Sequence, residues 1–472
     1  MSEKIKELEP TIQLSSTLSN DEGNTFLESQ QNHDIESQQK NEPINNDSNS
    51  SSTSSMKNFY VIASGYLLFT LTDSGLRMII LFQLYNLKYN ALQISLMFTL
   101  YEFCGVVTNL VGGILGSRMG LRFCLLIGLV FQIIGIGLLC GLRIDWSKTI
   151  VIIYIIISQG FSGIAKDLVK LGGKSVTKLV TKEENESHQS KLFKLVAWLT
   201  GAKNSIKGAG FFWGALLYRF IGYIPSLLVL LVMNLIVIPP ALFYLDHTLA
   251  VSKSKKKLTL KEIFNKGRNV NILSLARMFL FGSRDLWFEV PVPLFLRGPI
   301  GWSYLETGAF LAGWVMFYGA IQSSTPQLIL KPARIYPVKS GKILVPFTII
   351  LLVITIGIAF GLQFIDITTQ RTPLIILMIV GLFIFSFIFA INSSIHSFLI
   401  LAYCHRDKVA MNVGFYYMGN SIGRLLGLII GGVLFTYLNL AACLWFSVGA
   451  LILCTITSIF LGPVPEDEIN DS

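Results

Sequence analysis

Long apolar runs separated by short polar loops fill the chain from residue 58 to residue 462. A helix that crosses a bilayer needs about 20 mostly apolar residues, and each run is long enough to do so. Six runs precede a basic stretch and six follow it, which predicts an all-α polytopic membrane protein of about twelve transmembrane helices in two six-helix halves. The predicted spans are residues 58–84, 91–115, 121–142, 149–170, 193–218, 223–245, 270–296, 303–330, 342–364, 373–401, 410–437 and 440–462.

Residues 1–56 lack this pattern and are rich in Ser, Asn, Gln and Glu. A segment of this composition cannot bury enough apolar surface to offset its chain entropy, so we expect a disordered cytoplasmic tail. The remaining expected units are an N-terminal half at 57–245, a basic cytoplasmic loop at 246–269, a C-terminal half at 270–462 and a cytoplasmic tail at 463–472.

The composition fits a protein whose solvent is the lipid bilayer. Of the residues, 52% are hydrophobic and only 14% are charged, which is too apolar for an ordinary soluble domain. The net charge of +10 does not indicate nucleic-acid binding, because the lysines lie in loops between the predicted helices. The six cysteines include no CxxC pair, so no metal site, disulfide framework or cofactor is predicted.

The positive charges are distributed unequally between the two sides. The loops after the second, fourth, sixth, eighth and tenth spans, together with the helix ends beside them, hold 22 Lys and Arg residues, whereas the opposite loops hold 6. Cytoplasmic loops of membrane proteins are enriched in Lys and Arg, so both termini are predicted to be cytoplasmic.

A short internal similarity supports two related halves. The fifth span contains Asn204-Ser205-Ile206-Lys207, and the eleventh contains Asn420-Ser421-Ile422-Gly423-Arg424. These spans occupy equivalent positions in a six-plus-six duplication, which is the layout of many secondary carriers.

Ionisable residues inside the spans are costly in lipid and are therefore candidates for function. Asp73 and Arg77 are four residues apart on one helix face, so they can form an ion pair that stabilises the bundle, and a direct role in substrate binding is the alternative. Arg277 and Arg284 share a face with only Asp285 nearby, so at least one of them needs another anion. The spans hold the cations Arg77, Lys203, Lys207, Arg277, Arg284 and Arg424 against the acids Asp73, Glu102, Asp285 and Glu289.

This surplus of cations predicts a small organic anion as the substrate. Guanidinium groups bind carboxylate and phosphate oxygens in pairs. The alternative is that acids on neighbouring helices compensate these charges. Lys166, Asp167 and Lys170 are left out of the comparison because we expect them to snorkel to the cytoplasmic surface.

Two further residues have open roles. Glu102 is predicted either to carry a transported proton or to pair with an arginine. His396 is more often a packing residue than a proton relay in such a position. Together with Asp73 and Asp285, they form our candidates for proton coupling or ion pairing.

The loop after the second span resembles the G-x-L-a-D-r-x-G-r-r signature of the major facilitator superfamily. It contains Gly113, Arg118, Gly120 and Arg122, while Ser117 occupies the usual Asp position. In that family the loop forms a cytoplasmic gate, so the missing Asp removes its usual salt-bridge partner. A generic basic loop with a topological role is the alternative.

Several strings of charged and polar residues are similar to the organoarsenical efflux permeases of the ArsJ type, a group of the major facilitator superfamily. They extend from the first to the eleventh span. The matching strings are FTLTDSGLRM (69–78), YEFCGVVTNLVGGILGSRMGLR (101–122), SGIAKDL (162–168), LVAWLTGAKNSIKGAGFFWG (195–214), NILSLARMFLFGSRDLWF (271–288), INSSIHSFLILAY (391–403) and VGFYYMGNSIGRLLG (413–427).

The resemblance implies a major facilitator carrier that exports 1-arseno-3-phosphoglycerate by alternating access and confers arsenate resistance. We expect a monomer in the plasma membrane, because export of a toxic metabolite needs that location, and the vacuolar membrane is the alternative. Glyceraldehyde-3-phosphate dehydrogenase would supply this substrate by using arsenate in place of phosphate. Its two anionic ends suit the six intramembrane cations, which all lie within the matching strings. The long tail departs from the compact members of the group.

Other functions stay open on the sequence alone. A carrier of the same fold could transport another organic anion, such as a sugar phosphate or a phosphoglycerate. A receptor or scaffold that no longer transports is a second alternative, although charged residues within the spans argue against it. An enzyme is not indicated, because no motif places a nucleophile, a base and a metal together.

Overall fold

The computed structural model describes residues 47–119, 121–143, 145–180, 186–244, 266–335, 338–366, 369–404 and 409–464. The chain has two units, Met1–Ser54 and Ser55–Ser472, and the helical bundle belongs to the second. Helix α2 starts at Asp47, so the last ten residues of the predicted tail are helical. The rest of that tail, most of the basic loop at 246–269 and the end of the C-terminal tail lie outside the described residues.

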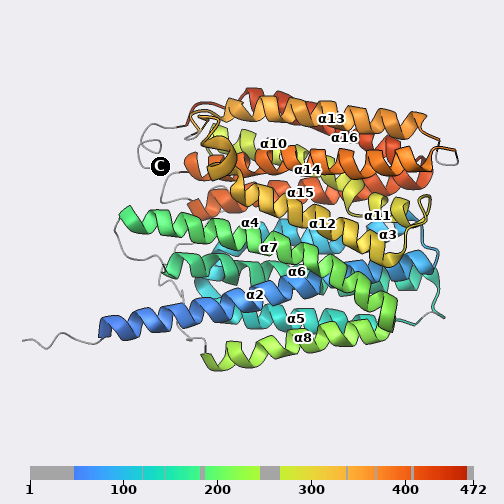
Figure 1. Cartoon of the computed structure of the whole chain (residues 1–472). Helices are drawn as coiled ribbons and strands as arrows, with labels where there is room; N and C mark the ends of the chain where they lie inside the picture. The colour runs from blue at the N-terminus through green and yellow to red at the C-terminus, as the bar shows by residue number, and fades with distance from the viewer. Residues whose placement is uncertain are drawn as a thin grey trace, which may run out of the picture. The chain divides into compact units, whose positions relative to one another are not determined.

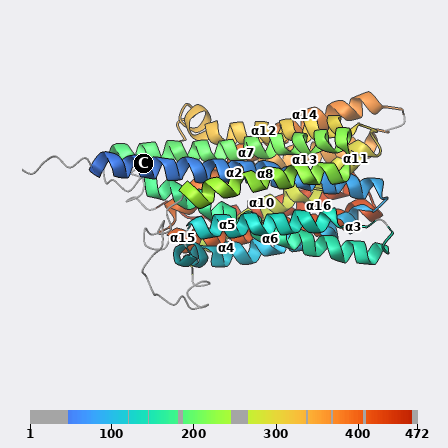
Figure 2. The same cartoon turned by 90° about the horizontal axis from the view of Figure 1, so that it is seen from below.

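Within the described residues, twelve helices have 20 residues or more and follow the order of the predicted spans. They lie side by side along a common direction (Figures 1 and 2). The long helices are α2 (Asp47–Asn86), α4 (Thr99–Met119), α5 (Leu121–Cys140), α6 (Lys148–Val180), α7 (Glu186–Ile221), α8 (Tyr223–Tyr244), α10 (Arg268–Phe288), α12 (Tyr304–Ser324), α13 (Leu344–Phe364), α14 (Arg371–Ala402), α15 (Val409–Tyr437) and α16 (Leu440–Ile459).

Two predicted spans are broken into a long and a short helix. The second consists of α3 (Ala91–Met97) and α4, and the seventh consists of α10 and α11 (Pro291–Arg297). Asn90 starts α3 with a capping box to Gln93, and Pro291 starts α11. A proline has no amide hydrogen to continue the preceding helix but fits the first turn of a new one.

Nine helices in the described part of the chain are long and apolar enough to cross a membrane. Helices α7, α10 and α12 fall short of that criterion. For α7 and α10 the reason lies in their charged residues, such as Lys207 and Arg284. These two helices contribute those charges to the interior of the bundle, where lipid does not contact them.

The outer surface of the bundle is apolar, as a bilayer requires. On α8, Leu228, Val232 and Ile236 lie four residues apart, and between 49% and 60% of each is exposed. Such a stripe would be a liability in water but is the expected contact surface for lipid chains.

The helices alternate in direction, so α2 begins and α16 ends at the same end of the bundle. We call this the terminal end, and it also holds the bridge between Ser340 and Pro463. The distal end holds the one-residue turn between α7 and α8 at Gly222. Gly222 has a φ of 78°, which a residue without a side chain adopts at little cost.

Contacts between the halves occur where α7 packs on α12 and where α4 and α3 pack on α15. Small residues allow close helix crossings within each half as well. A Cβ at Gly214 of α7 would lie 2.3 Å from the backbone oxygen of Gly75 of α2. Close approach of this kind is how membrane helices gain packing energy without a hydrophobic driving force.

Gly214→Ala should therefore destabilise the protein by about 1–3 kcal/mol, because the added methyl group overpacks a backbone contact. The measurement is the thermal unfolding temperature of the purified protein. Gly137→Ala is the matched control, since a Cβ at Gly137 meets nothing within 4 Å. Equal unfolding temperatures for the two variants would contradict the α2–α7 crossing.

Candidate functional site

A cavity of about 250 Å³ lies between the two halves. Helices α2, α4, α6 and α7 line it from the first half, and α10, α12, α14 and α15 line it from the second. Its charged lining residues are Asp73, Arg77, Lys166, Asp167, Lys170, Lys203, Lys207, Arg277, Arg284 and Arg424. All six cations predicted from the sequence thus line one cavity.

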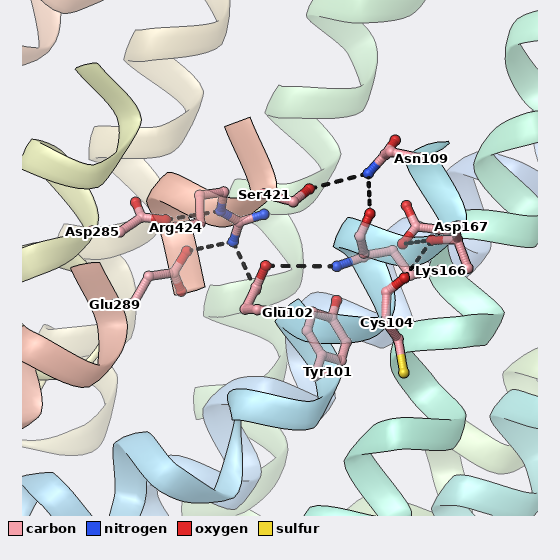
Figure 3. A network of polar contacts seen from close by, with 12 residues as sticks. Tyr101, Glu102, Cys104, Asn109, Lys166, Asp167, Asp285, Glu289, Ser421 and Arg424 are labelled. Atoms are coloured by element: carbon pink, nitrogen blue, oxygen red, sulfur yellow. Dashed lines mark hydrogen bonds and ion pairs between the residues drawn. The ribbon is translucent and has the colours of Figure 1, made fainter. Parts of the chain in front are cut away.

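A network of buried ion pairs joins the halves at this cavity. Arg77 of α2 lies 2.8 Å from Glu102 and 2.7 Å from Glu289. Arg424 of α15 contacts the same two carboxylates at 3.0 and 3.2 Å and adds Asp285 at 2.8 Å. Figure 3 shows Arg424 in the middle of these acids, which come from α4 and from the end of α10.

These carboxylates are deeply buried, with side chains of Glu102, Asp285 and Glu289 only 2%, 1% and 4% exposed. Removing a carboxylate from water costs several kcal/mol unless close cations and hydrogen bonds replace the lost hydration. Each of the three acids contacts at least two cations, and Arg77–Glu289 and Arg424–Glu102 cross between the halves. The network therefore stabilises a defined arrangement of one half against the other.

The two similar motifs meet in this network. Lys207 of the first motif lies 3.8 Å from Oε1 of Glu289, and Arg424 of the second motif lies 3.2 Å from the same atom. The asparagines of both motifs also line the cavity. Equivalent positions in the two halves thus contribute to one site, as an internal duplication predicts.

Arg277 has a different environment, because its partners are neutral. Its Nε donates to Oδ1 of Asn420 at 3.1 Å, and Nη1 donates to Oγ of Ser393 at 3.0 Å. Its guanidinium carbon lies 3.8 Å from the centre of the Phe281 ring. Although Arg277 is only 4% exposed, no carboxylate of the described residues lies within ion-pair distance of its guanidinium group.

Arg284, seven residues further along α10, also lies near the Phe281 ring. Its guanidinium carbon is 4.9 Å from the centre of the Phe281 ring, and it pairs with Asp285 at 2.5 Å. One of the two arginines on this helix face is thus compensated and the other is not. This is the situation that the single nearby acid predicted.

Of the two interpretations of Asp73 and Arg77, the direct ion pair is wrong. Asp73 accepts a hydrogen bond from the Tyr101 hydroxyl at 2.6 Å, while Arg77 binds Glu102 and Glu289. Spacing along one helix gave the candidate pair, but two carboxylates on other elements satisfy the guanidinium fork better.

The expectation that Lys166, Asp167 and Lys170 snorkel to the surface is also wrong. Helix α6 continues to Val180, so these residues lie inside the bundle and line the cavity. Lys166 lies over the Tyr101 ring at 3.8 Å, and Lys170 donates to Asn109 at 2.9 Å. Figure 3 shows Lys166 pointing towards Glu102.

Other predicted residues have diverse positions. Glu102 pairs with arginines, which is the second of its two predicted roles. His396 is fully buried, and neither ring nitrogen has a hydrogen-bond partner in the described structure. Arg122 donates to the Leu242 carbonyl at 2.7 Å. Gly120 lies outside the described residues, and only the helical backbone is described at Gly113 and Arg118, so the gate signature stays a prediction.

Counted over the described structure, the cavity and its network hold more cations than acids. The basic residues are Arg77, Lys166, Lys170, Lys203, Lys207, Arg277, Arg284 and Arg424. The acids are Asp73, Asp167, Glu102, Asp285 and Glu289. Neighbouring acids compensate part of the charge, as the alternative interpretation held, but a positive surplus persists.

The sequence model of the Major Facilitator Superfamily matches residues 62–397. The chain belongs to this superfamily. Its members are secondary transporters, so the chain is a multi-pass membrane carrier with the predicted all-α fold. No curated protein matches the sequence.

The fold is also found in a solved structure, described as the crystal structure of a bacterial homologue of the iron transporter ferroportin in an inward-facing state. The alignment covers 86% of this chain and 98% of the other, with a TM-score of 0.60 and 15% identity. At this identity the likeness shows the major facilitator architecture alone.

Some site residues were missed by the sequence interpretation although signals existed. Asn420 was noticed only as part of the repeat, yet it orients Arg277. Tyr101 bonds Asp73 and faces Arg77, with 4.5 Å between ring centre and guanidinium carbon. Tyr101 could have been found from the sequence, because it precedes Glu102 directly and lies in a string that matches the permease group.

Asp285→Asn should destabilise the carrier strongly, because it removes the carboxylate that Arg284 binds and one of those that Arg424 binds. Breaking a buried pair costs about 3–5 kcal/mol, whereas an exposed pair contributes about 1 kcal/mol or less. Thermal unfolding is the measurement. Asp145→Asn is the control, since the Arg143–Asp145 pair is exposed. A similar small effect of both substitutions would show that the network is not stabilising.

Proposed function

We propose that this carrier transports a small phosphorylated organic anion. The observation that carries the proposal is the cation-lined cavity between the halves, in which Arg277 has no carboxylate partner among the described residues. A phosphate or carboxylate oxygen would supply the missing negative charge and accept from the guanidinium in a charge-assisted hydrogen bond. Lys203 and Lys207 lie in the same lining and add positive potential.

The resemblance to organoarsenical efflux permeases makes 1-arseno-3-phosphoglycerate our first candidate substrate. This molecule has an anionic group at each end of a three-carbon chain, and the cavity has arginines on helices of both halves. Export would then follow its formation by glyceraldehyde-3-phosphate dehydrogenase. An ordinary sugar phosphate or phosphoglycerate is the second candidate, because the same cationic residues would bind it.

The structural neighbour is a homologue of an iron transporter, but a metal cation is a poor substrate for this cavity. A surplus of basic side chains raises the electrostatic energy of any cation that enters, and the lower dielectric of a bilayer interior strengthens this repulsion. The charge of the lining therefore favours an anion over a cation.

We further propose that the carrier acts as a monomer in the plasma membrane with both termini in the cytoplasm. The loops at the terminal end hold most of the Lys and Arg residues, as cytoplasmic loops do. In this orientation the lining residues Tyr66, Lys170 and Lys203 lie on the cytoplasmic side of the cavity. A metabolite made in the cytoplasm would enter from that side.

Arg277→Gln should weaken anion binding at least about tenfold, because a charged hydrogen bond contributes about 1.5–3 kcal/mol. The measurement is the phosphate or 3-phosphoglycerate concentration that raises the unfolding temperature by a fixed amount, such as about 2 °C, because ligand stabilisation grows with the ratio of concentration to Kd. Arg143→Gln, which removes one exposed arginine, should leave that concentration unchanged. Equal affinities in the two variants would show that Arg277 does not bind the anion.

The arsenical substrate predicts a phenotype in an arsenate-sensitive host. Expression of the carrier with glyceraldehyde-3-phosphate dehydrogenase should raise arsenate tolerance and lower cellular arsenic, whereas Arg277→Gln and Arg284→Ala should not. Efflux removes an unstable metabolite that would otherwise release arsenate inside the cell.

Unchanged tolerance, with the protein present at the cell surface, would exclude the arsenical. If 3-phosphoglycerate still stabilised the purified protein, the substrate would be an ordinary organic phosphate. If no phosphorylated or carboxylate anion stabilised it, the proposed substrate class would be wrong.

A further inference from the structure

The two acids that bind both Arg77 and Arg424 lie beside the breaks in their spans. Glu102 belongs to the first turn of α4, directly after the break at Phe98. Glu289 follows the last residue of α10 and precedes α11. Beyond each break, on the distal side, lies a helix of seven residues, α3 or α11.

These short helices take part in the contacts that join the halves at the distal end. In α3, the Leu92 amide donates to Oγ1 of Thr436 of α15 at 2.8 Å. Gly432 of α15 packs closely against Ser95 of α3, since a Cβ added at Gly432 would lie 2.4 Å from the Ser95 hydroxyl oxygen. The α3 helix of the first half is thus attached to the second half by its backbone.

Helix α11 ends in a second set of distal contacts. The Arg297 guanidinium carbon lies 3.7 Å from the centre of the Tyr304 ring. The Tyr304 hydroxyl donates to Oδ1 of Asn86 of the first half. The Phe82 and Tyr218 rings lie 4.9 and 5.2 Å from the Tyr304 ring, centre to centre. This cluster joins the two halves at the distal end.

Each acid also has a lysine just beyond hydrogen-bond distance. Nζ of Lys166 is 3.9 Å from Oε2 of Glu102, and that oxygen is buried without a hydrogen-bond partner. Nζ of Lys207 is 3.8 Å from Oε1 of Glu289. Both carboxylates therefore bind arginines in this structure and have a lysine nearby as an alternative cationic partner.

We propose that Glu102 and Glu289 are coupling residues with two positions. In the empty cavity the two carboxylates bind Arg77 and Arg424. When an anionic substrate binds these guanidiniums, Glu102 moves to Lys166 and Glu289 moves to Lys207. This movement releases α3 and α11. The distal end then opens at the two breaks. This proposal rests on the proposed function, because it needs an anion that competes for the arginines.

The exchange is physically balanced. A substrate oxyanion replaces a carboxylate on the arginines, and a lysine replaces the arginines on the carboxylate, so no buried charge is left uncompensated. Like charges disfavour simultaneous occupation of one guanidinium by both anions. A ligand shifts a conformational equilibrium only through a difference in affinity between the states, and displacement of the acids supplies that difference.

Hydrogen–deuterium exchange of the full-length protein tests the coupling, with 3-phosphoglycerate and inorganic phosphate as the probes. In the wild type, the anion should raise exchange in peptides covering α3 and α11 at least about fivefold. Glu102→Gln and Glu289→Gln should show raised exchange without anion and little further change. Asp145→Asn should behave as the wild type.

Lys166→Gln is the second variant, because it leaves the carboxylate–arginine pairs intact. Without anion it should exchange as the wild type does. At an anion concentration that raises its unfolding temperature as much as that of the wild type, so that loss of binding is not the cause, the response of α3 should be lost. A merely structural role of Glu102 does not predict this loss. An anion that raises the unfolding temperature of the wild type without changing exchange in α3 and α11 would overturn the coupling and leave the binding proposal intact.

If no anion raises the unfolding temperature, the proposed function fails. The variants without anion then still test the attachment of α3 and α11 to the network. Wild-type exchange in Glu102→Gln and Glu289→Gln would show that the acids do not hold these helices.

Discussion

The structure depends on how charged groups are compensated in the interior of a membrane protein. Glu102, Asp285 and Glu289 are almost fully buried, and lipid offers them no hydrogen-bond partners. Cations from five helices take the place of water around them. Because the acids and cations come from both halves, the requirement for compensation fixes the halves against each other and places the cavity at their interface.

The apolar pattern was sufficient to predict the helices of this fold, since lipid imposes both a length and a composition on a spanning helix. It could not predict that two spans are broken. The run at 91–115 is apolar across Phe98, where α3 ends, and only Pro291 and Pro293 signalled the second break. Local breaks depend on caps and tertiary contacts that an average hydropathy does not contain.

The charged residues of the site could be named from the sequence because they are rare in spans, and all six predicted cations line the cavity. Their pairing could not be predicted. Asp73 and Arg77 are neighbours along α2, yet Arg77 reaches Glu289, which is 212 residues away in sequence. Helical spacing describes contacts on one helix, whereas a guanidinium at a helix junction selects among carboxylates from every adjacent element.

The arginines of the cavity differ in what they can contribute to transport. The partners of Arg277, namely Asn420, Ser393 and Phe281, all belong to the second half, so the proposed anion site at Arg277 would move as one body and keep its affinity when the halves move. Arg77 and Arg424 bind acids of both halves, so their availability changes when the halves move. Equal binding gives affinity but shifts no equilibrium, whereas unequal binding shifts it. A carrier of the proposed kind needs both, and our proposal assigns them to different arginines.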